Sequence, residues 1–112
     1  MLRTVLHARL VIHRLDVDGV DLPVRFGTVV AVARAEAGGI DWEVVADCVH
    51  PIERGLGRCR VEMLCITGAD DEGHLVLGEL SGDAVVVRYV DRTLVLRGDG
   101  PLEGLTIDQM QG

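Results

Sequence analysis

Residues 40–48 read IDWEVVADC, and this stretch decides the fold class because its apolar and polar side chains alternate. Successive side chains of a β-strand point to opposite faces, so the alternation predicts a strand with one buried face and one solvent-exposed face. The buried face is predicted to carry Ile40, Trp42, Val44, Ala46 and Cys48. The acidic residues Asp41, Glu43 and Asp47 are predicted to point outwards.

The same two-residue period recurs along the chain, and no segment of ten or more residues shows a convincing helical stripe. In the first segment one face carries Leu2, Leu6, Ala8, Leu10 and Ile12. Turns are predicted at Asp18-Gly19, at SGD (81–83) and at DRT (91–93), and such short connections favour an antiparallel meander. We therefore predict an all-β fold: a single small antiparallel domain, residues 1–112, of about seven strands. The sheet is expected to curl into a barrel or a barrel-like sandwich, which buries its apolar face.

The second long segment, residues 20–35, is apolar on both faces. One face, predicted to be the core face, carries Val20, Leu22, Val24, Phe26, Val30 and Val32, with Gly27 at a bulge or bend. The opposite face carries Val29, Ala31, Ala33 and Ala35. A strand that is apolar on both sides is expected to be shielded from water on both sides, and a second subunit would bury the outer one. The sequence therefore predicts a homodimer.

Composition narrows the classes of partner and compartment. The net charge is −7 and the arginines are scattered, whereas nucleic-acid binding needs a basic footprint, so we expect no nucleic-acid partner. No apolar run approaches the length of a membrane helix, and arginine and histidine interrupt the N-terminal apolar residues. We expect no membrane association and a cytoplasmic protein with reduced thiols. The absence of lysine and the wealth of Arg, Ala, Gly and Val are typical of a GC-rich bacterial genome.

Residues 47–59, DCVHPIERGLGRC, hold two of the three cysteines. Cys48, His50 and Cys59 could meet at a closing hairpin as a zinc or thiol site, and Cys48–Cys59 could form a disulfide. Cys65 lies six strand residues from Cys59, roughly 20 Å, so the two cannot share one ion. We favour the simpler interpretation that all three cysteines are buried core residues. Nothing in the sequence indicates a cofactor.

Few other polar residues are candidates for a functional site. His7, His13 and His50 are the candidate acid–base groups, and Arg9, Arg54 and Arg58 are candidate ligand-binding residues, the last two because they flank the Gly-x-Gly of the 47–59 segment. His7, Arg9 and His13 share the polar face of the first strand. That face is expected to meet water, although it would line a pocket if the barrel had a partly polar lumen.

These observations support a small non-catalytic β domain that acts as a binding or interaction module and is a homodimer. Its partner would be a protein or a small hydrophobic ligand. The alternative is a small β-barrel enzyme of the cyclase or isomerase type that acts on a hydrophobic metabolite. A closed apolar cavity with an inward histidine or carboxylate would favour the enzyme, and a filled core would favour the module.

Overall fold

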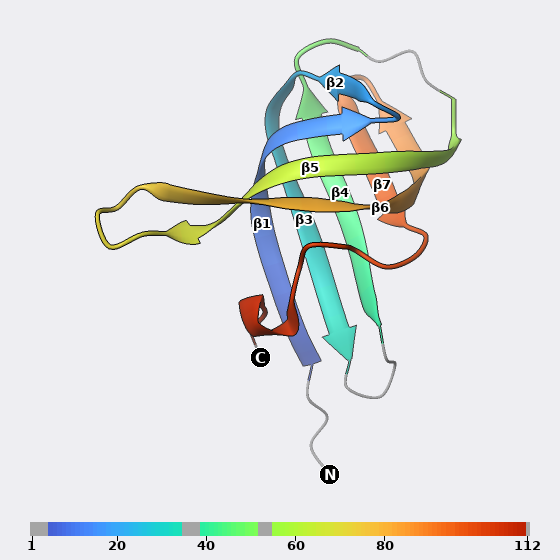
Figure 1. Ribbon diagram of the computed structural model, residues 1–112. Coiled ribbons are helices and arrows are strands. Elements are labelled where there is room, and N and C mark those ends of the chain that lie inside the picture. The colour runs from blue at the N-terminus through green and yellow to red at the C-terminus, as the bar shows by residue number, and fades with distance from the viewer. Residues whose placement is uncertain (1–4, 35–38, 52–54, 112) are drawn as a thin grey trace.

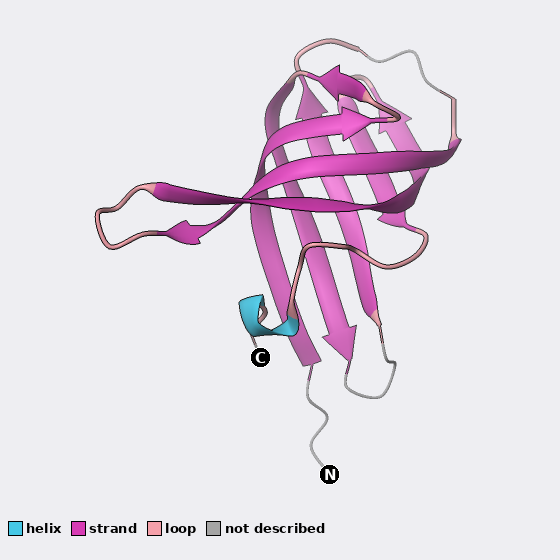
Figure 2. Cartoon of the chain, viewed as in Figure 1, coloured by secondary structure: helices cyan, strands magenta, loops and turns pink. Residues whose placement is uncertain are grey.

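The computed structural model describes residues 5–34, 39–51 and 55–111, and most of them lie in β-strands (Figures 1 and 2). The elements are β1 (Val5–Val17), β2 (Val20–Leu22), β3 (Val24–Arg34), β4 (Ile40–Cys48), β5 (Gly57–Ala69), β6 (Leu75–Val90), β7 (Thr93–Gly98) and the 3₁₀ turn η1 (Ile107–Gln109). Among the described residues, no helix is long and apolar enough to span a bilayer.

Six of the strands form a closed antiparallel barrel, which confirms the predicted all-β class. The hydrogen-bonded order is β1-β3-β4-β7-β6-β5, and β5 pairs with β1 to complete the circle, while β2 is an extra strand beside β1 (Figure 1). The predicted simple meander is wrong. The chain forms two units, β1-β3-β4 and β5-β6-β7, which are joined through the β4–β7 and β1–β5 pairs.

Two of the three predicted turns are present. Asp18 and Gly19 have φ values of 51° and 80°, and they connect the paired residues Val17 and Val20 in a two-residue hairpin. The chain also turns between β6 and β7, where Asp91 has a φ of 55°.

The predicted SGD turn does not exist, because β6 runs straight through residues 81–83. All three residues pair with β5, with Val61 opposite Gly82 at the centre. The glycine is needed for packing instead, since a Cβ at Gly82 would lie 2.6 Å from Cζ2 of Trp42. The signal that suggested a turn therefore marks the site where the indole packs on the backbone.

The predicted core face of β3 is also wrong for most of its length. Val24 pairs with Cys48 but Phe26 pairs with Asp47, so one extra residue is inserted in β3 just before Gly27. Such a bulge exchanges the two faces of a strand beyond it. The residues of β3 that enter the core are consequently Val29, Ala31 and Ala33. Phe26 and Val30 are 55% and 39% exposed, and Val32 is half-buried. Ala35 lies outside the described residues.

The barrel is filled by aliphatic side chains, sulfur and one indole. Its most deeply buried side chains are Leu15, Val17, Val29, Val44, Cys48, Val61, Cys65, Leu80, Val86, Leu94 and Leu96. The faces predicted for the first segment and for 40–48 are confirmed where the structure describes them: Ala8, Ile12, Trp42, Val44, Ala46 and Cys48 are buried, and Leu6, Leu10 and Ile40 are partly buried against the core. Leu2 lies outside the described residues. The segment after β7 then crosses from β6 to β1 (Figure 1), where residues 103 and 111 pair with Ser81 and His7. It adds Leu102, Leu105 and Met110 to the core.

The contact between Trp42 and Gly98 gives a first prediction. A Cβ at Gly98 would clash with Nε1, Cε2 and Cδ1 of the Trp42 indole, so Gly98→Ala is expected to overpack the core. We expect it to lower the free energy of unfolding by about 2 kcal/mol, measured by denaturant titration with Trp42 fluorescence. Gly68→Ala in β5 is the control, because a Cβ there meets nothing within 4 Å. Equal stability of the two variants would contradict this account of the core.

Candidate functional site

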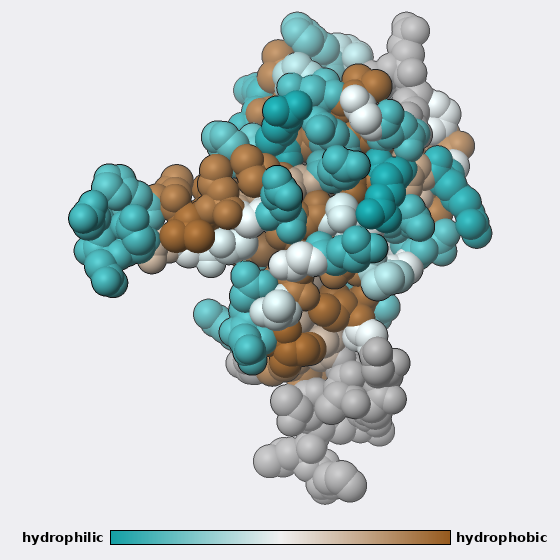
Figure 3. All heavy atoms as spheres, viewed as in Figure 1, coloured by the Kyte–Doolittle hydropathy of each residue, from teal (hydrophilic) through white to brown (hydrophobic). Residues whose placement is uncertain are grey.

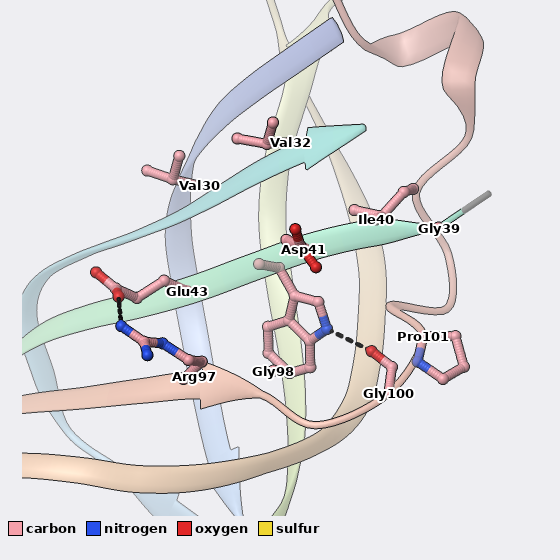
Figure 4. Close-up of a pocket in the computed structure, with 11 residues that line it drawn as sticks. Val30, Val32, Gly39, Ile40, Asp41, Glu43, Arg97, Gly98, Gly100 and Pro101 are labelled. Atoms are coloured by element: carbon pink, nitrogen blue, oxygen red, sulfur yellow. Dashed lines mark hydrogen bonds and ion pairs between the residues drawn. The ribbon is translucent and has the colours of Figure 1, made fainter. Parts of the chain in front are cut away.

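A groove of about 900 Å³ opens on the outer surface of the barrel beside the single tryptophan. Val30 and Val32 of β3 line one side, and residues of β4 and β7 form the floor (Figure 4). Gly100 and Pro101, which follow β7, close one end. The groove is open to solvent, in contrast to the filled barrel interior.

Trp42 reaches this groove only with its edge. The residue is 4% exposed, and its indole N–H donates a 2.9 Å hydrogen bond to the carbonyl oxygen of Gly100. This bond satisfies the only polar atom of the ring, so the side chain can remain buried. Trp42 is therefore a core anchor, as predicted, and it fixes the segment after β7 against the barrel.

The charged groups of the groove are exposed and partly paired. Arg97 of β7 and Glu43 of β4 are cross-strand neighbours, and their Nη2 and Oε2 atoms lie 3.7 Å apart (Figure 4). An exposed pair of this kind contributes little to stability because water screens it. Asp41 lies between this pair and Gly39 along β4 (Figure 4). The arrangement provides polar anchors around an apolar floor.

A second groove, of about 550 Å³, lies on the same side of the barrel. It is lined by Arg9 of β1, Phe26 and Thr28 of β3, Val45 and Asp47 of β4, and Thr93 of β7, and it shares Val30 with the first groove. Thr28 is the one buried polar residue among those described. The two grooves are therefore parts of one surface, the outer side of β1, β3, β4 and β7.

This surface carries an apolar band, which we call the valine face. Strand register places Val11, Thr28, Val45 and Val95 in one row across all four strands. Val30, Val32 and Phe26 extend it along β3. Val11, Val30 and Val45 are each 39% exposed. The valine face is defined as Val11, Phe26, Thr28, Val30, Val32, Val45 and Val95.

The candidate acid–base groups lie outside the barrel. His7, His13 and His50 are all exposed, as is Arg9, so the polar side of the first strand faces water as expected. Of these residues, only Arg9 lines one of the two grooves.

The Gly-x-Gly loop with the candidate ligand-binding residues Arg54 and Arg58 is only partly described. Arg58 is exposed, and its Nη2 lies 3.5 Å from Oδ2 of Asp99. Arg54 lies outside the described residues. The loop therefore provides one described arginine, and a carboxylate already neutralises it.

All three cysteines are free thiols and buried, so the Cys48–Cys59 disulfide is absent and the core interpretation is confirmed. His50 is exposed, whereas Cys48 and Cys59 point into the core. Within residues 5–34, 39–51 and 55–111, no group of three or more His, Cys, Asp or Glu side chains is placed to hold a metal ion. The three candidate ligands of the zinc hypothesis are not brought together.

Burial makes the thiols poor nucleophiles. Desolvation raises the pKa of Cys65 to about 11, and it also raises the pKa of Cys48, to which the charge of Asp47 adds. Thiolate is the reactive form of cysteine, so these two side chains are inert at neutral pH while the protein is folded.

Sequence reasoning missed the valine face because it assigned Val30 and Val32 to the core. The doublets Val29-Val30 and Val44-Val45 were the available signal, since each doublet must place one valine on the outer side of its strand. Comparison with protein-family models finds no match for this chain, and comparisons with curated protein sequences and with solved structures find none either.

The buried thiols give a prediction about reactivity. With excess iodoacetamide at pH 8, we expect the native protein to gain almost no label and the unfolded protein to gain three, as counted by intact mass. The reason is that alkylation requires thiolate and access, and the native core denies both. Rapid labelling of all three cysteines under native conditions would contradict the structure.

The raised pKa of Cys65 also predicts a dependence of stability on pH. The unfolded chain loses the thiol proton near pH 9, whereas the folded protein holds it to about pH 11. The contribution of Cys65 to the free energy of unfolding is therefore fully present below pH 9, and it is lost as the pH rises from 9 to 11. We expect Cys65→Ala to be less stable at pH 7 but to lose less stability over this range. Parallel curves from urea titrations of the two proteins would refute the assignment.

Proposed function

We propose that this protein is a non-catalytic β-barrel interaction module that associates with a second copy of itself through the valine face. One observation carries the proposal: a row of three valines and Thr28 crosses four strands on the outer side of the barrel, with Phe26 and Val30 exposed beside it, while the inner side of the same strands is already buried in the core. Antiparallel sheets normally have one apolar and one polar side. A sheet that is apolar on both sides gains free energy when a partner covers the outer one.

The charges around the valine face support a second copy as the partner. The margins of the face carry three arginines, Arg9, Arg88 and Arg97, and three carboxylates, Asp41, Glu43 and Asp47. They balance, although the whole chain has a net charge of −7. Two copies of an acidic protein repel one another over most of their surfaces, so a charge-balanced apolar face is where they approach at least cost.

The interior favours a module over the enzyme alternative. Every inward-facing group in the described core is an aliphatic side chain, a thiol, a thioether or the Trp42 indole. All four histidines are exposed: His7 and His13 on β1, His50 after β4 and His74 before β6. Acid–base catalysis on an enclosed metabolite needs such a group to face the substrate, and the described interior offers none.

The proposal predicts a concentration-dependent dimer. In sedimentation velocity, the double variant Val30→Glu/Val45→Glu is expected to raise the Kd at least about thirtyfold, which corresponds to about 2 kcal/mol lost at a central contact. Burying two unpaired carboxylates in the interface is the physical cause. Val20→Glu is the control for a carboxylate added outside the interface, because Val20 is 59% exposed on β2 and lies away from the face. A wild-type protein that stays monomeric at high micromolar concentration would overturn the proposal.

A further inference from the structure

The β5–β6 hairpin projects well beyond the barrel as an arm, defined here as residues 66–77 (Figure 1). β5 pairs with β1 only between Val61 and Cys65, and β6 pairs with β7 only from Ala84 onwards. Within the arm, the two strands therefore pair only with each other. Both edges of the arm present backbone groups that no described strand occupies.

The arm is apolar along its strands. Leu75, Val76 and Leu77 are 64%, 43% and 41% exposed, and Figure 3 shows a hydrophobic band between the body and the hydrophilic tip. Strand register sets Ile66 opposite Leu77 and Ala69 opposite Leu75, so these four residues share one side of the arm. A two-stranded ribbon with exposed leucines is only marginally stable in water without a further surface to pack on.

The tip of the arm is nevertheless well formed. One carboxylate oxygen of Asp70 accepts hydrogen bonds from the backbone N–H groups of Glu72 and His74, at 3.0 and 2.8 Å. Its other oxygen lies 3.3 Å from Nδ1 of His74, and Gly73 takes the positive φ of 85° that the turn requires. The arm therefore ends in a turn whose conformation is fixed by hydrogen bonds. An ordered tip of this kind favours docking on another surface.

The charge of the tip complements the margins of the valine face. Asp71 and Glu72 add to Asp70, so the tip is strongly acidic. On the valine face, Arg9 lies at the β1 margin and Arg88 lies beside Val95 at the β6 margin. Neither arginine has an ion pair with any residue in the described part of the chain. The acidic tip and these unpaired arginines are therefore complementary surfaces of the same protein.

We infer that the arm of one copy lies across the valine face of a second copy, with its leucines on the valines and its acidic tip beside Arg9 or Arg88. The inference rests on the proposed function and names the segment that fills the interface. Each subunit has one arm and one face, so two copies related by a two-fold axis satisfy both reciprocally.

Charge reversal tests the inference. We compare Asp71→Arg/Glu72→Arg, which reverses the tip, with Arg9→Glu/Arg88→Glu, which reverses the face; Asp70 is kept because it holds the turn. Each variant alone is expected to raise the dimer Kd at least about tenfold, because like charges then meet at both contacts. Mixed in equal amounts, the two variants are expected to form a heterodimer with near wild-type Kd, since each arm again meets a face of opposite charge. Sedimentation velocity with one variant fluorescently labelled measures this.

The control matched to the tip variant is Glu62→Arg/Asp108→Arg, which makes the same change in net charge as that variant but away from the arm, and it is expected to leave the Kd unchanged. Circular dichroism of every variant confirms that the barrel is intact. If neither reversal changes the Kd while Val30→Glu/Val45→Glu still abolishes the dimer, the valine face is the interface and the arm inference is wrong. If the two weakened variants fail to pair when mixed, it is also wrong. A wild-type protein that is monomeric would contradict both the proposed function and this inference.

Discussion

The bulge in β3 between Val24 and Phe26 determines which side chains of this strand enter the core and which face outwards. One inserted residue exchanges the two sides of the strand, so that small side chains, Ala31 and Ala33, fill the barrel while Phe26 and Val30 face outwards. These small residues share one core cluster with bulkier side chains from β5 and β6, such as Met63 and Leu80. The same exchange leaves an apolar surface on the outside. One irregularity in the backbone therefore produces both the packing of the interior and the apolar surface on the exterior.

Trp42 provides the second constraint, because it links three separate parts of the chain. Its ring lies where side chains on Gly82 and Gly98 would otherwise stand, and its N–H holds Gly100. β6, β7 and the segment that follows them are therefore positioned against β4 by one side chain. The first groove lies beside this junction, so the packing of Trp42 helps to set its shape.

The sequence predicted those features that depend on a single strand or turn. The alternation in 40–48, the buried cysteines and the Asp18-Gly19 hairpin are local, and all agree with the structure. The errors arise where the outcome depends on a partner strand. Gly82 resembles a turn residue until the indole that covers it is known. The sequence predicts a bulge or bend at Gly27, but only the register against β4 shows that the extra residue lies between Val24 and Phe26 and exchanges the faces of β3. The valine face and the arm both follow from these non-local pairings, so the site could not be assembled from the sequence.

The β4–β7 and β1–β5 pairings affect how the chain folds during synthesis. The three-stranded units β1-β3-β4 and β5-β6-β7 are each built from neighbours along the chain, but the circle closes only when the second unit has been made in full. Until β7 leaves the ribosome, β4 has a bare edge and the first unit has an uncovered inner face. Closure brings together residues that are far apart in the chain, and such non-local pairing is intrinsically slow to form. We therefore expect the nascent chain to expose an unpaired strand edge and an uncovered apolar face until its last strand has been made.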